Sequence, residues 1–241
     1  MARRPKRERK APTPPPRGSS DRDKAIDALM ALLAERGFED IGLAEVAGRA
    51  GLKMSQLRAE FGSTLSIFAA HVKDIDRAVL AGGEDMTDES PRERLFDVLM
   101  RRLEAMAPYK EAVRSMLHSA RRHAGLAFAL NCMAVRTQRW MLEAAGINAA
   151  GKRGALRAQG AALMFARVLS VWIDDDEPGL DRTMAALDRG LASAERWDGF
   201  VGDLCAIPAA ILRGPRRRRQ ARAGIGRLKS RPRTTVFAAL H

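Results

Sequence analysis

Apolar side chains recur every three or four residues from Ile26 to Leu33, which is the spacing of one face of an α-helix. A shorter run with the same period follows from Leu43 to Ala47, and Leu57 and Phe61 continue it at i, i+4. This pattern predicts three short helices. We expect Asp21 or Asp23 to cap the start of the first helix and Gly37 to end it.

A glycine separates the second and third of these helices. In the sequence Ala50-Gly51-Leu52, the glycine tolerates a positive φ and lets two helix backbones approach at a sharp turn. The order of helices and turns is the outline of a helix-turn-helix, in which the last helix enters the DNA major groove. The residues expected to point outward from that last helix are Lys53, Ser55, Gln56, Arg58, Ala59 and Glu60. Glutamine and arginine are side chains that contact base edges or hold phosphates.

The helical period resumes after a polar joint near residue 84 and continues to about residue 212. The helices expected there are 91–108, 109–121, 125–145, 154–174 and 180–198. Strand signals are nearly absent, so the sequence predicts an all-α protein with an N-terminal three-helix domain and a C-terminal helical bundle. The segment 161–173 has only Arg167 and Ser170 as polar residues. We expect it to be buried all round, in a core, a dimer seam or a ligand cavity.

Positive charge is concentrated at the two ends of the chain. The formal net charge is +13, yet residues 25–212 carry 23 Lys/Arg against 26 Asp/Glu. Residues 213–241 carry ten Lys/Arg and no acid. Both ends are rich in Pro, Gly and Arg, so 1–20 and 213–241 are expected to be disordered basic tails. Such tails either bind the phosphates of a nucleic acid or an anionic lipid surface, or remain solvated.

The sequence offers little support for an enzyme or for export from the cell. The four histidines form no HExxH pattern, and neither a phosphate-binding glycine loop nor a GxSxG motif occurs. We therefore expect no catalytic residue, metal site or cofactor. The acidic run 174–177 lacks the spacing of a calcium loop and is expected to be solvated. No secretion signal or membrane-spanning run is evident, and two cysteines fit a reducing compartment, so the expected location is cytoplasmic.

The run GFEDIGLAEVAGRAGLKMSQLRAEFGS (37–63) resembles the DNA-binding domain of TetR-type (TetR/AcrR) transcriptional regulators. The matching residues are Gly37, Phe38, Val46, Ala47, Ala50, Gly51, Leu52, Leu57, Phe61 and Ser63. The resemblance implies a helix-turn-helix domain with a connecting helix at 21–82 and a ligand-binding and dimerisation domain at 84–212. It also implies a ligand-responsive repressor that binds a palindromic operator as a homodimer, and it adds Ser63 to the DNA-binding residues.

Three positions depart from that family pattern. Gly42 stands where the family has a capping threonine that contacts phosphate, Arg58 where it has a tyrosine, and Thr64 where it has a lysine. Arg58 is able to hold phosphate in place of the tyrosine. Gly42 cannot replace the phosphate contact of the threonine, and Thr64 cannot replace that of the lysine. The alternative interpretation is a helix-turn-helix fold that no longer binds specific DNA.

The second half of the chain has candidate ligand-binding residues, which are Met133, Trp140, Met164, Arg167 and Trp172. Methionine and tryptophan suit a small apolar ligand or a lipid, and Arg167 suits an anionic group. Ordinary core packing and a salt bridge are the alternatives. The stretch from Trp140 to Trp197 also resembles the lipid-binding accessory proteins of ubiquinone biosynthesis, which share the TetR fold. That resemblance implies a lipid or isoprenoid ligand and the loss of specific DNA binding.

Overall fold

The computed structural model describes residues 20–82 and 88–193, all of which belong to one compact unit, residues 1–200. The all-α prediction is confirmed, because every regular element in these two ranges is helical. The predictions of basic tails at 1–20 and 213–241 lie outside the described residues, except for Ser20. The expected end of the last helix at 198 and of the second domain at 212 lie outside them as well.

The first three helices, with a short 3-10 turn, form the part that we call the head, residues 20–63. Its elements are α1 (Asp21–Glu35), η1 (Phe38–Asp40), α2 (Leu43–Ala50) and α3 (Met54–Glu60). The predicted apolar face of α1 is confirmed, since Ile26, Leu29 and Leu33 are fully buried. Val46 of α2 and Leu57 of α3 complete this core. Burying these side chains provides the main driving force for folding of the head.

The ends of α1 differ from the prediction. Ser20 is the N-cap in place of Asp21 or Asp23, and its side chain accepts a hydrogen bond from the backbone N of Asp23 at 3.1 Å. Serine caps as well as aspartate does. At the other end the helix stops at Glu35 and Arg36 is extended, so Gly37 lies one residue beyond the cap and is extended too. No left-handed residue is needed there, because the chain leaves α1 in an extended conformation.

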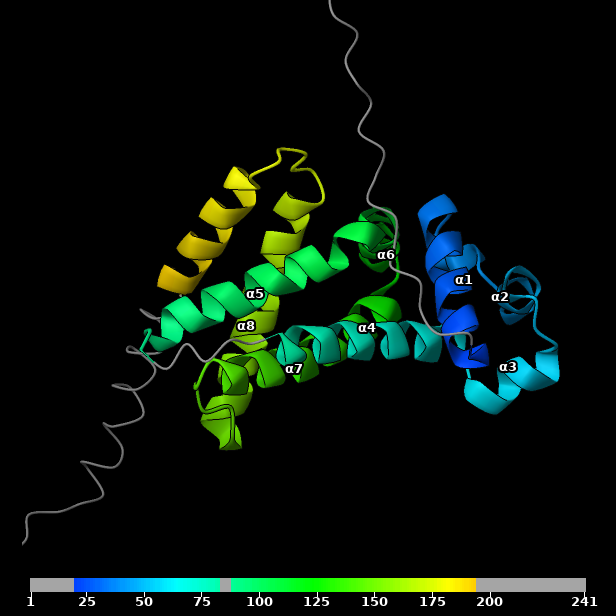
Figure 1. The fold of residues 1–241 in the computed structure, drawn as a ribbon, viewed down its shortest axis with the longest axis horizontal. Helices are drawn as coiled ribbons and strands as arrows, with labels where there is room; N and C mark the ends of the chain where they lie inside the picture. Colours follow the sequence, from blue (N-terminus) through cyan, green and yellow to red (C-terminus); the bar gives the residue numbers. More distant parts are fainter. Residues whose placement is uncertain (1–19, 83–87, 194–241) are drawn as a thin grey trace, which may run out of the picture. The chain divides into compact units, whose positions relative to one another are not determined.

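The remaining helices form the part that we call the body, residues 88–193, and a long helix joins it to the head. The joining helix is α4 (Thr64–Ala81). The body contains α5 (Pro91–Met106), η2 (Ala107–Tyr109), α6 (Lys110–Arg122), α7 (Ala124–Ala144), α8 (Gly151–Trp172) and a helical stretch at 181–193. The predicted helices are all present, and their observed starts lie within three residues of the expected ones. Figure 1 shows α1, α2 and α3 grouped at one end of α4.

Contacts from both parts converge on two helices. α4 packs against α1 of the head and against α5 and α7 of the body, and α6 of the body packs against α1. Two serines of α6 also bind the turn that follows α1. The backbone N of Phe38 donates to Ser119 Oγ at 3.0 Å, and Ser115 Oγ donates to the carbonyl of Arg36 at 2.7 Å. The head is therefore attached to the body through α4 and α6.

The segment 161–173, expected to be buried all round in a core, a dimer seam or a ligand cavity, is only partly buried within the single chain. Phe165 and Trp172 lie in the core, but Leu163 is 52% exposed and Arg167 is exposed. Helix α8 contacts α7 on one side. On another side it meets the helical stretch 181–193, where the backbone of Gly190 is so near that a Cβ added to this glycine would lie 2.7 Å from Met164. A third side of α8 faces outward. None of the described helices is both long enough and apolar enough to cross a bilayer.

Candidate nucleic-acid interface

Helix α3 lies on the surface of the head because a tight turn presents it there. Gly51 has φ 67° and ψ 29°, a left-handed conformation that favours glycine. The backbone N of Leu52 then donates to the carbonyl of Ala47 at 2.9 Å and closes the turn. Leu57 is the one buried side chain of α3, so the rest of the helix is exposed. This is the arrangement that a recognition helix requires.

The structure brings together five of the six predicted DNA-binding residues. Lys53, Ser55, Gln56, Arg58 and Ala59 are all exposed on α3 or at its N-cap. Ser63 is exposed as well, but it lies beyond α3 and caps α4, where its Oγ accepts from the backbone N of Ser66 at 3.1 Å. Its backbone N donates to Ser66 Oγ at 3.0 Å, so Ser63 and Ser66 together fix the start of the connecting helix.

Gln56 already has partners within the protein. Its Oε1 accepts from the backbone N of Lys53 at 2.9 Å, and its Nε2 donates to Asp21 Oδ2 at 2.8 Å. The lysine is a poor cap, and Gln56 closes the start of α3 in its place. Before Gln56 can contact a base edge, it must exchange these two hydrogen bonds for bonds to DNA.

Gly42 stands where the family pattern has a capping threonine, and Glu45 binds the backbone of this glycine. The backbone N of Gly42 donates to Glu45 Oε2 at 3.0 Å, and Arg36 pairs with Glu45 Oε1 at 2.7 Å. The hydrogen bond from Gly42 lowers the pKa of Glu45 below its usual value. Helix α2 therefore has no side-chain cap at Gly42, and the carboxylate of Glu45 binds the backbone N of Gly42 instead.

One exposed residue of α3 escaped the sequence analysis. Met54 begins the helix and is 50% exposed. It lies three residues before Leu57, and that apolar spacing is typical of an inward position, so the period alone could not identify it. An exposed methionine at this place is able to contact the methyl group of thymine, as apolar side chains do in the major groove.

The charge of the head is nearly balanced and slightly acidic. Residues 20–63 contain six Lys/Arg and eight Asp/Glu. Some of the arginines are neutralised, as where Arg49 pairs with Glu35 at 2.8 Å. Lys53 and Arg58 form no ion pair within the described residues. They are therefore the head's available cations for phosphate, and both lie next to or on α3.

The five predicted ligand-binding residues are not gathered around one cavity. Trp140 is 59% exposed on α7 and Arg167 is exposed on α8. Asn131 and Gln159 pair their amides across α7 and α8 at 3.0 and 3.1 Å, whereas the side chains of Trp140 and Arg167 are exposed to solvent. The other three predicted ligand-binding residues are less exposed. Met133 and Met164 are half-buried, and Trp172 is buried with the Lys110 ammonium 5.7 Å from its ring centroid.

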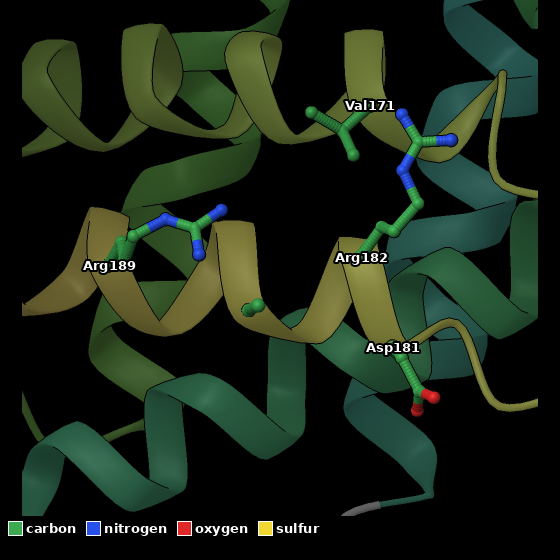
Figure 2. A pocket seen from close by; sticks show the side chains of 5 residues that line it. Val171, Asp181, Arg182 and Arg189 are labelled. Carbon is green, nitrogen blue, oxygen red and sulfur yellow. The ribbon is translucent and has the colours of Figure 1, made fainter.

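A groove of about 420 Å³ lies elsewhere, between α8 and the helical stretch 181–193. Its lining residues are Val171, Asp181, Arg182, Ala185 and Arg189, none of which was predicted to bind a ligand. Figure 2 shows Arg182 reaching up beside Val171 while Asp181 points away from α8. The groove is open and its floor is apolar with arginines at its rim. Among the described residues, no group of His, Cys, Asp or Glu is arranged to hold a metal ion.

Comparison with known proteins identifies the fold. No protein-family model and no curated protein matches the chain. Solved structures do. A TetR transcriptional regulator from Nitrosomonas europaea is 23% identical with a TM-score of 0.57, over 72% of this chain and 97% of that one. A TetR regulator from Rhodococcus sp. RHA1 is 22% identical with a TM-score of 0.51, over 74% and 97%.

A third solved structure extends the likeness further along the chain. A TetR-family regulator from Streptomyces coelicolor is 14% identical with a TM-score of 0.51, and the match covers 81% of this chain and 90% of that one. The chain has the fold of the TetR-type transcriptional regulators.

Proposed function

We propose that this protein is a DNA-binding transcriptional regulator that reads DNA with α3. The observation that carries the proposal is the exposure of α3 on a single buried anchor, Leu57, directly after the left-handed turn at Gly51. A helix presented in this way fits the major groove, which is wide enough for one helix and displays a distinct pattern for each base pair. The likeness of the fold to structures described as TetR regulators supports the same function.

The exposed side chains divide into two roles. Lys53 and Arg58 hold phosphates and set the register of the protein on the duplex. Met54, Ser55 and Gln56 face base edges, with Ala59 beside them for a thymine methyl. The slightly acidic head supplies little general attraction, so the basic segments at the two ends of the chain are the source of sequence-independent affinity.

The body supports a homodimer. The outward side of α8 carries Leu156 and Leu163, which are 56% and 52% exposed, with the small Gly160 between them. Exposed large apolar residues along one helix are typical of a protein–protein contact. A second copy is the natural partner, because a two-fold dimer places two α3 helices one DNA turn apart on a palindromic operator.

Repression and control by a small apolar ligand or a lipid form the further part of this proposal. Any such ligand has to favour one position of α4 over another, because it otherwise shifts no equilibrium. Helix α4 supports that role since it contacts both the head and the body.

The test is DNA binding by the full chain. Wild-type protein selects duplexes from a random library, and its affinities for selected and scrambled DNA are compared at about 0.15 M salt. The triple variant Lys53→Ala, Ser55→Ala, Arg58→Ala is expected to lose the preference for selected DNA. It should keep a weak, salt-sensitive affinity for both duplexes. Arg121→Ala with Arg122→Ala, two exposed changes at the end of α6, is the matched control and should keep the preference.

A second candidate function is favoured by the eight acidic against six basic residues of the head. It is a lipid- or isoprenoid-binding accessory role in quinone biosynthesis, without specific DNA binding. If wild-type protein enriches no sequence from the library, α3 is not a reader and the first proposal fails. Extraction and mass spectrometry of lipids that copurify with the full chain then test the second.

A further inference from the structure

A hydrogen bond joins the first turn of α1 to an exposed side chain of α3. Asp21 Oδ2 accepts from Gln56 Nε2 at 2.8 Å, although the two residues are 35 positions apart in the chain. Figure 1 shows α3 beside α1, and the two helices are in contact. The side chain of Asp21 is 34% exposed. A carboxylate of α1 therefore lies at the edge of the surface that α3 presents.

The second oxygen of this carboxylate has a weaker partner. Lys24 Nζ lies 3.4 Å from Asp21 Oδ1 in the same turn of α1, and the lysine side chain is 47% exposed. Water and salt screen a pair of this kind, so it contributes little. Gln56 is the nearer of the two partners. If Gln56 turns to a base, the carboxylate of Asp21 loses its better donor.

A base that Gln56 contacts has to take the place that Asp21 occupies in the free protein. The amide of glutamine matches adenine, because it donates to N7 and accepts from N6. The N7 atom that replaces Asp21 Oδ2 at Gln56 Nε2 then lies next to the released carboxylate. Two acceptors without a donor between them are unfavourable, so Asp21 requires a new donor. The backbone N of Lys53, which loses Gln56 Oε1, lies at the exposed N-cap, where water replaces that bond.

Cytosine is the base that supplies such a donor without an acceptor beside it. Its edge in the major groove carries the N4 amino group alone, and aspartate accepts a hydrogen bond from this group. Guanine offers N7 and O6, thymine offers O4, and adenine has N7 next to its amino group. Asp21 Oδ2 and Gln56 Nε2 are 2.8 Å apart, and successive bases of one strand are about 3.4 Å apart. The two side chains therefore fit neighbouring base pairs.

We propose that Asp21 is a further base-contacting residue, which selects a cytosine beside the adenine contacted by Gln56. The two side chains bind each other in the free protein, and each exchanges that hydrogen bond for a base when DNA binds. Asp21 also disfavours guanine and thymine at its position, since a carboxylate repels their acceptors. The inference rests on the proposed function, because it requires α3 to enter the major groove. It adds a specificity-determining residue that lies outside α3.

Selection of duplexes from a random library by the full chain tests this inference. The wild type should enrich cytosine next to adenine within its site. Asp21→Ala should reduce the preference for that cytosine about five- to tenfold and leave the other positions of the site unchanged. Asp21→Asn keeps the size of the side chain but adds an amide donor, so guanine and thymine should become acceptable there. Asp40→Ala removes an exposed negative charge from η1 and is the matched control, which should change no base preference.

A residue that only supports α3 would give a different result. Asp21→Ala would then weaken the preference at every position of the site to a similar extent, and this outcome would overturn the inference. Gln56→Ala should lose the adenine but keep the cytosine, and loss of both would mean that Asp21 acts only through Gln56. If the wild type enriches no sequence, the proposed function fails and the inference fails with it. A specific wild type whose cytosine preference survives Asp21→Ala overturns the inference alone.

Discussion

In the head, the side chains that are buried within residues 20–63 are all apolar, whereas the body buries a set of polar and charged groups. That set consists of Arg102, Ser119, Thr137, Gln138, Asp175 and Thr183. Most of these groups bind a partner that lies far away in the chain or in another helix. The head keeps its charges outside, in pairs such as Arg49 with Glu35.

This difference separates two ways of specifying a structure. The head needs only an apolar period and a turn, both of which are local. The body needs particular partners, as where Asp175 Oδ2 accepts from the backbone N and the Oγ1 of Thr183 at 2.9 and 2.7 Å. That pair fixes the loop after α8 to the helical stretch 181–193. A change at a buried site of the head should therefore act through volume, whereas the body also has buried polar sites, such as Asp175, where a change acts through hydrogen bonds.

The largest effect is expected in the apolar core of the head. Leu29 is fully buried in α1, and Leu29→Ala removes apolar contacts and leaves a cavity, at a cost of about 2–5 kcal/mol in the free energy of unfolding. Leu29→Met keeps the volume and should cost less than about 1.5 kcal/mol. Urea unfolding followed by circular dichroism measures both. Equal losses of stability for Leu29→Ala and Leu29→Met would contradict a core whose stability depends on the volume of its side chains.

The matching change in the body is Asp175→Asn. Burial alone would raise the pKa of Asp175, but hydrogen bonds from Thr183 and from the backbone of Glu177 outweigh it and lower the pKa. The substitution removes the charge that these donors stabilise, at about 1–3 kcal/mol. Because the folded pKa lies below the unfolded value, this stability is present above the ordinary aspartate pKa of about 3.9 and is lost as pH falls through the folded value.

Unfolding curves of wild type and Asp175→Asn across pH test that assignment. The difference between them should be constant near neutral pH and shrink in acid. Thr183→Val removes one of the donors but keeps the shape, so it should lower stability at neutral pH in the same direction. A difference that grows as the pH falls would mean that the carboxylate is destabilised by folding.

Local sequence patterns predicted the helices and the turn of the head better than they predicted the side-chain contacts of the candidate site. The glycine turn at Gly51 and the buried anchor Leu57 follow from neighbours in the sequence, and both are confirmed. The hydrogen bond between Gln56 and Asp21 joins residues 35 positions apart, and no period indicates it. The sequence does not indicate the buried ion pair between Asp76 of α4 and Arg102 of α5 either, because an arginine at a helical position is expected at the surface.

The outward side of α8 shows the same limit. Its composition predicted burial all round, yet the composition of one helix does not say how many neighbours the fold supplies. In the described structure α7 and the stretch 181–193 cover two sides of α8, and Leu156 and Leu163 remain outside.

Two glycines of the head give a smaller effect with opposite signs. A Cβ at Gly51 or at Gly48 would meet no other atom within 4 Å, so only the backbone decides the outcome. Gly51 is left-handed, and Gly51→Ala should cost about 1–2 kcal/mol. Gly48 lies inside α2, and Gly48→Ala should stabilise by about 0.5–1 kcal/mol. Thermal unfolding of the two variants side by side measures the contrast, and a gain from both would show that the turn does not require its conformation.

The smallest effect is expected for the charges on the surface of the head. Arg49 and Glu35 form two hydrogen bonds at 2.8 Å, but both side chains are exposed, and water and salt screen such pairs. Arg49→Ala should leave the unfolding midpoint unchanged at about 0.15 M salt and lower it slightly in low salt. The body offers the contrast, since Asp175→Asn should lower stability at either salt concentration. If Arg49→Ala destabilised the head as much as Asp175→Asn destabilises the body, the contrast between exposed charges in the head and a buried charge in the body would not hold.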